Sequence, residues 1–198
     1  MRIIGLTGGI ASGKSFVAEL LEKLGAAVVD ADVVYHELLA QKELREKISQ
    51  EFGTDFFLPD GSLDRKKLGK LVFSDKSALS RLNDITHPAV RAELFARLKT
   101  FSERQPPPKL AVVVVPLLYE VGWDEHVEAV VVVSVDDKTQ IERLMNRNGW
   151  SRDEALARIG SQMPLAEKVK RADYVVDNSG QRDKTEKLIK EVYEKLTA

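Results

Sequence analysis

The stretch GGIASGKS, residues 8–15, decides the fold. It matches the pattern G-x-x-x-x-G-K-S/T, with Gly8, Gly13, Lys14 and Ser15 at the defining positions. Glycines at these positions let the backbone wrap closely around a phosphate group, so that several N–H groups point at its oxygens. We therefore predict a phosphate-binding loop for a nucleoside triphosphate, with Lys14 at the β- and γ-phosphates and Ser15 on Mg²⁺.

The residues on both sides of the motif agree with this prediction. Residues 2–7 form a short apolar segment typical of a buried strand, and residues 14–24 place apolar side chains on one helical face. Gly25 is suited to end that helix as its C′ residue. The helix N-terminus would add partial positive charge beside the phosphates. A glycine-rich turn without a ligand is the weaker alternative, because both the spacing and the context fit the loop.

Apolar strands and helical patterns alternate along the chain. Further short apolar segments lie at 26–29, 110–115, 129–135 and 174–176. Helical patterns lie at 33–39, within 137–171 with breaks near Gly149 and Pro164, and at 183–196. Near-continuous apolar strands are typical of a parallel sheet that is buried on both faces. We predict a three-layer α/β fold, with a five-stranded parallel sheet and helices on both faces.

Residues 41–105 form a long, charged and mostly helical region between the second and third predicted strands. A turn is expected at PDG, residues 59–61, and Pro88 is expected to break or begin a helix. The segment QPPP, residues 105–108, closes the region as a stiff connector. The region resembles an insertion at one end of the sheet. Ligands of such sheets bind at the carboxyl ends of the strands.

The composition limits the class of protein. The chain has 198 residues, 43% of them hydrophobic, which is enough for one α/β core with a small inserted subdomain. A net charge of −1 gives no general attraction to nucleic acid or membranes, so neither partner is expected. The absence of cysteine excludes disulfides and thiol nucleophiles. With no signal peptide and no long apolar run, we expect a cytoplasmic protein, either a monomer or a small homo-oligomer.

Other signals narrow the kind of P-loop protein. The chain has no N-K-x-D segment for guanine, and DNSG at 177–180 lies too near the C-terminus for a GTPase switch. The apolar strand at 110–115 runs into PLLYE, residues 116–120, rather than into the acidic pair of an AAA-type ATPase. A small-molecule kinase remains. Such an enzyme needs an acceptor site, a base or positioning group, and a basic lid.

Two carboxylates follow the second predicted strand, at the mouth of the expected cleft. Asp32 could accept the proton of an attacking hydroxyl or orient that hydroxyl. It could equally be the N-cap of the following helix, and its position alone does not separate the two roles. Asp30 is better placed to support Mg²⁺ or the loop.

Basic residues are concentrated in residues 137–171. They are Arg143, Arg147, Arg152, Arg158, Lys168, Lys170 and Arg171. Guanidinium groups stabilise the charge on a phosphoryl group in transfer. A solvated helix face is the simpler explanation for any single arginine, whereas the cluster as a whole favours a lid.

The chain resembles the dephospho-CoA kinase family, which phosphorylates the ribose 3′-hydroxyl of dephospho-CoA in the last step of coenzyme A biosynthesis. The similar segments run through nearly the whole chain in the family's order. They are GLTGGI (5–10), SGKS (12–15), VDAD (29–32), DGSLDR (60–65), VF (72–73), ITHP (85–88), PLLYE (116–120), RADY (171–174) and DNSG (177–180). Each is weak by itself except the phosphate-binding loop, and their ordered recurrence makes the resemblance specific.

The resemblance implies a role for each matching residue. The catalytic residues would be Asp32 as the base, Lys14, and Arg147 as the lid arginine on the phosphates. Contacts to ATP are implied for Gly8, Gly9, Ile10, Ala11, Ser12, Gly13, Lys14, Ser15 and Phe16, with Asn178 and Gly180 near the adenine. Contacts to the acceptor are implied for Thr7, Asp32, His87, Pro116, Leu117 and Glu120. Mg²⁺ is implied at Ser15 and Asp30.

The resemblance also implies a division of the chain. Residues 1–40, 109–136 and 172–198 would form the nucleotide-binding core, residues 41–108 a helical acceptor subdomain, and residues 137–171 the lid. Two alternatives stay open at this point. One is another small-molecule kinase on the same scaffold, such as a nucleoside monophosphate kinase. The other is a nucleotide-gated binding module without catalysis.

Two residues depart from the family pattern within or beside the loop. Ala11 replaces a common glycine, and Phe16 replaces a usual threonine. Because a methyl group at position 11 narrows the allowed backbone angles, we predict a negative φ there. Phe16 could contribute backbone contacts to the nucleotide or pack on the core instead.

Overall fold

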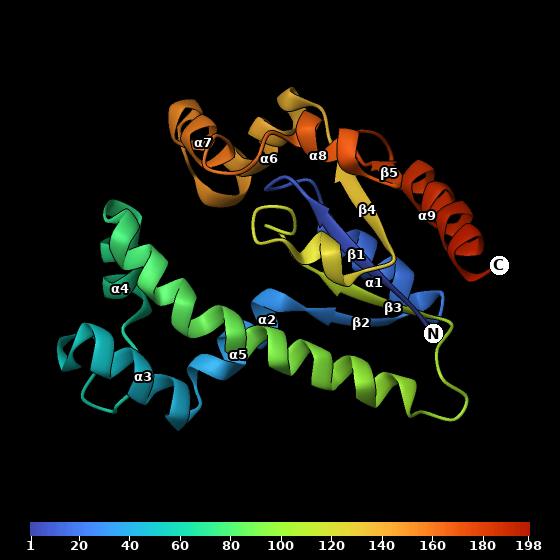
Figure 1. Ribbon diagram of the computed structural model, residues 1–198. Coiled ribbons are helices and arrows are strands. Elements are labelled where there is room, and N and C mark those ends of the chain that lie inside the picture. The colour runs from blue at the N-terminus through green and yellow to red at the C-terminus, as the bar shows by residue number, and fades with distance from the viewer. The chain divides into compact units, whose positions relative to one another are not determined.

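The computed structural model describes all 198 residues, and it divides into two compact units (Figure 1). The first unit comprises Met1–Asp30 and Thr100–Ala198, and the second comprises Ala31–Lys99. The first contains the sheet, whereas the second is built of helices with one isolated bridge between Phe57 and Leu63. None of the helices combines the length and apolar character needed to cross a membrane.

The sheet has five parallel strands in the order β2-β3-β1-β4-β5. The strands are β1 (Arg2–Gly8), β2 (Ala27–Asp30), β3 (Leu110–Val114), β4 (Ala129–Ser134) and β5 (Tyr174–Asp177). The central strand β1 pairs with both β3 and β4, and its Ile4 lies opposite Val112 and Ala129. The predicted α/β fold with a five-stranded parallel sheet is confirmed.

The core explains why these segments are strands. Ile4 and Leu6 of β1 are fully buried, and so is almost all of the valine-rich β3. Helices α1 (Lys14–Lys23) and α9 (Arg182–Thr197) contribute Leu21 and Ile189 to the same buried cluster. On the other face of β1, Leu118 and Val127 close over Gly5. Burial on both faces therefore accounts for the near-continuous apolar runs.

Three helices occupy the predicted basic region of the first unit. They are α6 (Asp137–Asn148), α7 (Arg152–Ile159) and α8 (Leu165–Arg171), and a short helix η2 (Trp123–His126) precedes them. Gly149 ends α6 with a φ of 67°, and Ser151 begins α7 with a capping box to Glu154. Such caps satisfy backbone groups that a helix end leaves unpaired. The predicted breaks near Gly149 and Pro164 are thus confirmed.

The second unit contains α2 (Ala31–Leu39), α3 (Lys42–Phe52), η1 (Thr54–Phe56), α4 (Arg65–Ser74) and α5 (Lys76–Ser102). Its own core includes Val34, Ile48 and Leu94, which are fully buried. The predicted turn at residues 59–61 separates η1 from α4, with a φ of 77° at Gly61.

The expectation that Pro88 breaks or begins a helix is wrong, because Pro88 lies inside the 27-residue helix α5. Proline has no N–H to donate to the carbonyl of Asp84, so one helical hydrogen bond is missing. The helix continues because buried side chains, among them Leu82 and Leu94, hold it on both sides of the proline. Packing in the folded chain thus overrides the local preference of proline.

Replacing Pro88 by alanine should therefore stabilise the protein. Alanine restores the missing donor, and we expect a gain of about 1 kcal/mol, below the ~3 kcal/mol host-peptide difference because proline also restricts the unfolded chain. Urea unfolding followed by circular dichroism measures the change. Arg91→Ala, at an exposed position of the same helix, is the matched control and should leave the midpoint nearly unchanged. A lower midpoint for Pro88→Ala would show that the proline itself supports α5.

Candidate functional site

The loop between β1 and α1 depends on glycine at several points. At Gly8, a Cβ would lie 2.4 Å from the backbone oxygen of Val133. Gly13 has a φ of 93°, and a Cβ there would collide with the side-chain amide of Asn178. At Gly9, a Cβ would lie 2.6 Å from the Nε2 of Gln140. A side chain at Gly9 or Gly13 would therefore displace the amide group of Gln140 or Asn178 from the loop.

Those close neighbours hold the loop by its carbonyl groups. Gln140 Nε2 donates to the carbonyl of Ile10 at 2.8 Å, and Asn178 Nδ2 donates to that of Ser12 at 2.8 Å. The guanidinium of Arg143 donates to the carbonyls of Asn178 at 2.8 Å, Ser12 at 3.4 Å and Ala11 at 3.5 Å. We call Gln140, Arg143 and Asn178 the loop clamp.

Lys14 completes the set of bonds to loop carbonyls. Its Nζ donates to the carbonyls of Gly9 at 3.0 Å and Gly8 at 3.3 Å. Every carbonyl from Gly8 to Ser12 thus accepts a hydrogen bond from a side chain. The peptide planes are fixed as a result, and the first amides of α1 are left without a partner inside the helix.

A cleft of ≈ 610 Å³ opens beside the loop. It is lined by Ala11, Gly13, Lys14, Ser15, Phe16, Arg143, Asn146, Arg147, Asn178, Gly180 and Arg182. Four of these side chains are cationic and none is a carboxylate, so the cleft suits an anionic ligand. Seven of the eleven residues implied for ATP line this cleft together with Arg147, whereas Gly8, Gly9, Ile10 and Ser12 belong to the loop but not to the cleft wall.

The sequence analysis did not predict three features of the cleft, namely the bonds from Arg143 to the loop and the presence of Asn146 and Arg182 in the cleft wall. Gln140 escaped prediction too. The spacing of Gln140, Arg143 and Arg147 along α6 places them on one helical face, which is the signal that could have found them. Arg182, at the start of α9, lies over the ring of half-buried Phe16, with its guanidinium 5.3 Å from the ring centroid. Phe16 therefore packs against a cation at the cleft wall and is not among the core residues.

The prediction of a negative φ at residue 11 is wrong. Ala11 has a φ of 59°, in the left-handed region. An L-residue there costs about 1–2 kcal/mol relative to the right-handed conformation. Bonds to the carbonyls on either side, from Gln140 at Ile10 and from Arg143 at Ser12, hold the strained residue in place.

The predicted residues of the β1 and β3 ends lie close together. Thr7 is fully buried and donates from Oγ1 to the carbonyl of Pro116 at 3.1 Å. Leu117 is 40% exposed. The carboxylate of Glu120 accepts hydrogen bonds from Lys168 and from the amide of Met163. Glu120 is thus engaged by two parts of the predicted lid.

The remaining predicted residues lie at the end of β2 or in the helical unit. Asp30 is the last residue of β2. Asp32 lies in the first turn of α2, which begins at Ala31, so the alternative of Asp32 as an N-cap is wrong. A carboxylate in a first turn is stabilised by the helix dipole. His87 lies on α5, and burial lowers its pKa despite the opposing effect of nearby Asp84.

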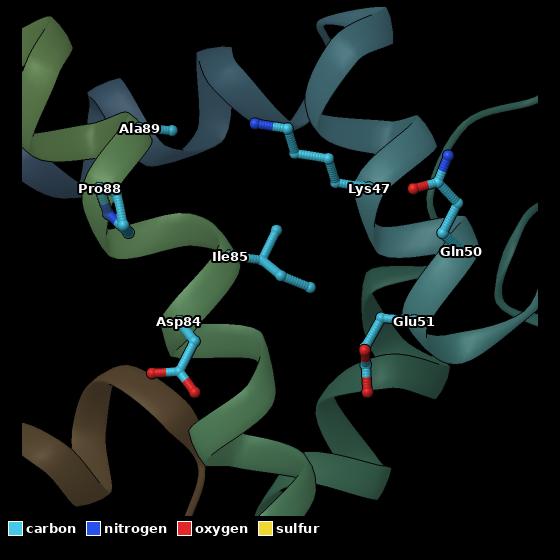
Figure 2. A pocket seen from close by; sticks show the side chains of 7 residues that line it. All are labelled: Lys47, Gln50, Glu51, Asp84, Ile85, Pro88 and Ala89. Atoms are coloured by element: carbon cyan, nitrogen blue, oxygen red, sulfur yellow. The ribbon is translucent and has the colours of Figure 1, made fainter.

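The helical unit has a cavity of its own, with a volume of ≈ 620 Å³. Its lining residues are Lys47, Gln50 and Glu51 of α3, and Asp84, Ile85, Pro88 and Ala89 of α5. Lys47 extends from α3 towards α5, and Ile85 points into the gap between the two helices (Figure 2). The cavity therefore combines an apolar floor with charges of both signs.

Residues 2–184 match the family model described as dephospho-CoA kinase. A dephospho-CoA kinase from Symbiobacterium thermophilum is 50% identical over 93% of this chain and 77% of its own length. One from Geobacter sulfurreducens is 45% identical over 98% of both chains. The solved dephospho-CoA kinase from Campylobacter jejuni superposes with a TM-score of 0.73 at 28% identity, covering 100% of this chain and 98% of that one.

Replacing Ala11 by glycine should raise the stability of the loop. Glycine removes the left-handed strain of about 1–2 kcal/mol, offset by about 0.5–1 kcal/mol of additional unfolded-state entropy. We expect a net gain of up to about 1.5 kcal/mol in the free energy of unfolding, measured by denaturant titration. A loss of stability would mean that the alanine methyl makes a favourable contact that outweighs the strain.

Replacing Asn178 by aspartate should weaken nucleotide binding. The carboxylate retains the size of the amide and still accepts from Thr185, but it cannot donate to the carbonyl of Ser12. Two acceptors would then face each other in a buried place, and we expect the Kd for ATP to rise about tenfold or more. Isothermal titration calorimetry measures the Kd, with circular dichroism confirming the fold. An unchanged Kd in a folded variant would show that the clamp does not shape the loop.

Proposed function

The chain belongs to the dephospho-CoA kinase family, and we propose a role for each site residue in the transfer of a phosphoryl group from ATP to dephospho-CoA. One observation carries the proposal. The loop whose carbonyls at residues 10–12 accept hydrogen bonds from Gln140, Arg143 and Asn178 adjoins a cleft that carries four cationic side chains. The unpartnered amides of a helix N-terminus and local cations are what a triphosphate needs when the whole chain is nearly neutral.

ATP binds in this cleft, with its β- and γ-phosphates in the loop at Lys14. Asn178 and Gly180 line the same cleft, and the adenine lies on their side of it. Phosphoryl transfer passes through a loose transition state in which charge spreads over the γ-phosphoryl oxygens. Arg147 on α6 stabilises that charge as part of a lid formed by residues 137–171.

Mg²⁺ fits the donors near the loop. No group of three or more His, Cys, Asp or Glu side chains could hold a metal by itself. Magnesium needs no such group, because it keeps several waters and binds one or two protein oxygens together with substrate phosphates. The exposed Ser15 in the cleft and Asp30 at the end of β2 would provide those oxygens. When bound, the ion would neutralise charge on the β- and γ-phosphates.

Asp32 acts on the acceptor hydroxyl. It lies two residues after Asp30 in the chain, so their Cα atoms are separated by no more than about 7 Å. The ribose 3′-oxygen bonds to the γ-phosphorus, the bond from that phosphorus to the bridging oxygen breaks, and ADP leaves. The hydroxyl proton passes to the Asp32 carboxylate. Because the transition state is loose, orienting the hydroxyl contributes to the rate as well.

The acceptor is held by residues 41–108 and by the loop after β3. Support comes from the cavity between α3 and α5, which offers an apolar floor and polar side chains to a large amphipathic substrate. His87 on the same helix α5, together with Thr7, Pro116, Leu117 and Glu120, borders the acceptor. The enzyme works in the cytoplasm, as a monomer or a small homo-oligomer.

The proposed acceptor is tested by substrate competition. Purified protein with Mg-ATP is offered dephospho-CoA, a nucleoside monophosphate or shikimate in separate reactions, and ADP release is measured. We expect release with dephospho-CoA only. Turnover with another acceptor and none with dephospho-CoA would overturn the proposal, and ATP binding without any turnover would indicate a binding module.

Asp32→Asn should lower kcat by at least about a hundredfold, because general-base catalysis contributes about 10²–10⁴ to the rate. The Kd for ATP should stay near the wild-type value, since the loop and clamp are untouched. Steady-state kinetics and calorimetry separate the two quantities. Glu43→Gln is the control, because Glu43 is also a carboxylate in the first turn of a helix of the same unit. Near-normal turnover of Asp32→Asn would show that Asp32 is neither base nor orienting group.

A further inference from the structure

Lys168 is the largest fully buried side chain of the protein, with no exposed surface. It lies on α8, and its Nζ donates to the carbonyl of Pro116 at 2.8 Å. The same ammonium lies 2.9 and 3.1 Å from the two carboxylate oxygens of Glu120. Desolvating a cation is so unfavourable that buried ion pairs add little net stability. All the hydrogen bonds and ion pairs of the Lys168 ammonium go to Pro116 and Glu120, which suggests that this buried lysine has a role besides stability.

The partners of Lys168 connect two loops at the carboxyl end of the sheet. We name residues 162–168 the strap and residues 115–122 the β3 loop. The amide of Met163 donates to Glu120 at 2.9 Å, so the strap holds the β3 loop at two points. Its neighbour Gln162 accepts from the amide of Ile10 at 2.9 Å, inside the phosphate-binding loop. The strap therefore touches both loops at once.

A further contact reaches the phosphate-binding side from the β3 loop. The carbonyl of Pro116 that receives Lys168 also receives the hydroxyl of Thr7, the residue just before the loop glycines. Arg171 adds a second attachment of α8, with its guanidinium 5.7 Å from the ring centroid of Tyr119. Burial raises the pKa of Tyr119 to about 12, so the phenol is neutral beneath that cation.

The topology shows why this place matters. β1 and β3 are neighbours in the sheet, but the chain leaves β1 towards β2 and leaves β3 towards β4 on the opposite side. Right-handed connections that run in opposite directions along a sheet lie on opposite faces of it, which leaves a crevice between the two loops, and parallel sheets bind substrates in that crevice. The phosphate-binding loop and the β3 loop are its two walls. Lys168 and the strap contact both loops and so fix the distance between them.

We propose that Lys168 is a positioning residue that sets the β3 loop against the phosphate-binding loop. The inference rests on the proposed function, because it assigns the β3 loop to the acceptor side. Lys168 touches neither substrate. Its ammonium fixes the Pro116 carbonyl and the Glu120 carboxylate, and Glu120 in turn fixes the strap that carries Gln162 to Ile10. Losing the ammonium should therefore impair the transfer step more than nucleotide binding, since the loop clamp holds the nucleotide site independently.

The test must separate positioning from simple stability. Lys168→Met alone leaves the Glu120 carboxylate without its cation and should lower Tm. The double variant Lys168→Met/Glu120→Leu removes both charges, and a buried apolar pair is often as stable as the ion pair it replaces. We expect this variant to recover a Tm near that of the wild type. Its kcat with dephospho-CoA should still be at least about tenfold below wild type, with the Kd for Mg-ADP changed less than about threefold.

Two further variants complete the experiment. Lys170→Met is the matched control, because Lys170 lies on the same helix, is 69% exposed and pairs only with Glu167 across one helical turn. It should leave Tm, kcat and Kd unchanged. Gln162→Leu leaves the buried pair intact and removes the contact to Ile10. It should lower kcat at least about threefold with an unchanged Tm, and it decides the question if the double variant does not fold.

A double variant with wild-type Tm and a kcat within about twofold of wild type would overturn the role of Lys168. So would a Gln162→Leu variant with unaltered kcat, or a Kd for Mg-ADP that rises as much as kcat falls. A wild-type chain that is inactive towards dephospho-CoA would instead overturn the proposed function. The two failures are therefore distinguishable in one set of assays.

Discussion

The hydrogen bonds from Gln140, Arg143 and Asn178 to the loop carbonyls are the constraint on which the site depends. A glycine-rich loop is flexible by itself, and its peptide planes could face either way. The clamp fixes them because the parallel sheet places β4 and β5 on one side of β1. The helix after β4 and the turn after β5 then reach the loop. Fold and phosphate binding are thus connected through side chains far from the motif in sequence.

Local placement of charge follows from the same arrangement. The chain as a whole is nearly neutral, with 30 basic and 31 acidic side chains. The proposed affinity for a triphosphate would therefore come from the cations of one cleft, which are Lys14, Arg143, Arg147 and Arg182. Arg143 serves the loop and the cleft together, since its guanidinium bonds to three carbonyls while it lines the cleft wall.

The sequence was sufficient to predict features whose signal lies within a few neighbouring residues. The loop motif, the valine-rich strands and the capped helices of residues 137–171 each carry their signal within a few residues. The errors and omissions share a different cause. Pro88 inside α5, the positive φ of Ala11 and the burial of Lys168 are all imposed by groups distant in sequence. The spacing of Gln140 and Arg143 in the sequence indicates that they share one face of α6. The partner of that face is the phosphate-binding loop, and the sequence does not reveal it because the contact depends on the pairing of β1 with β4.

A crystal structure with Mg-ADP bound would show whether Gln140, Arg143 and Asn178 shape the phosphate-binding loop. We expect Gln140, Arg143 and Asn178 to stay on the carbonyls of residues 10–12, and the β-phosphate to accept from amides of residues 13–15. The distances from the clamp nitrogens to these carbonyls should match those of the ligand-free chain. If Arg143 left the carbonyls to bind phosphate, or if the loop carbonyls faced the nucleotide, then the loop clamp would not be what shapes the nucleotide site.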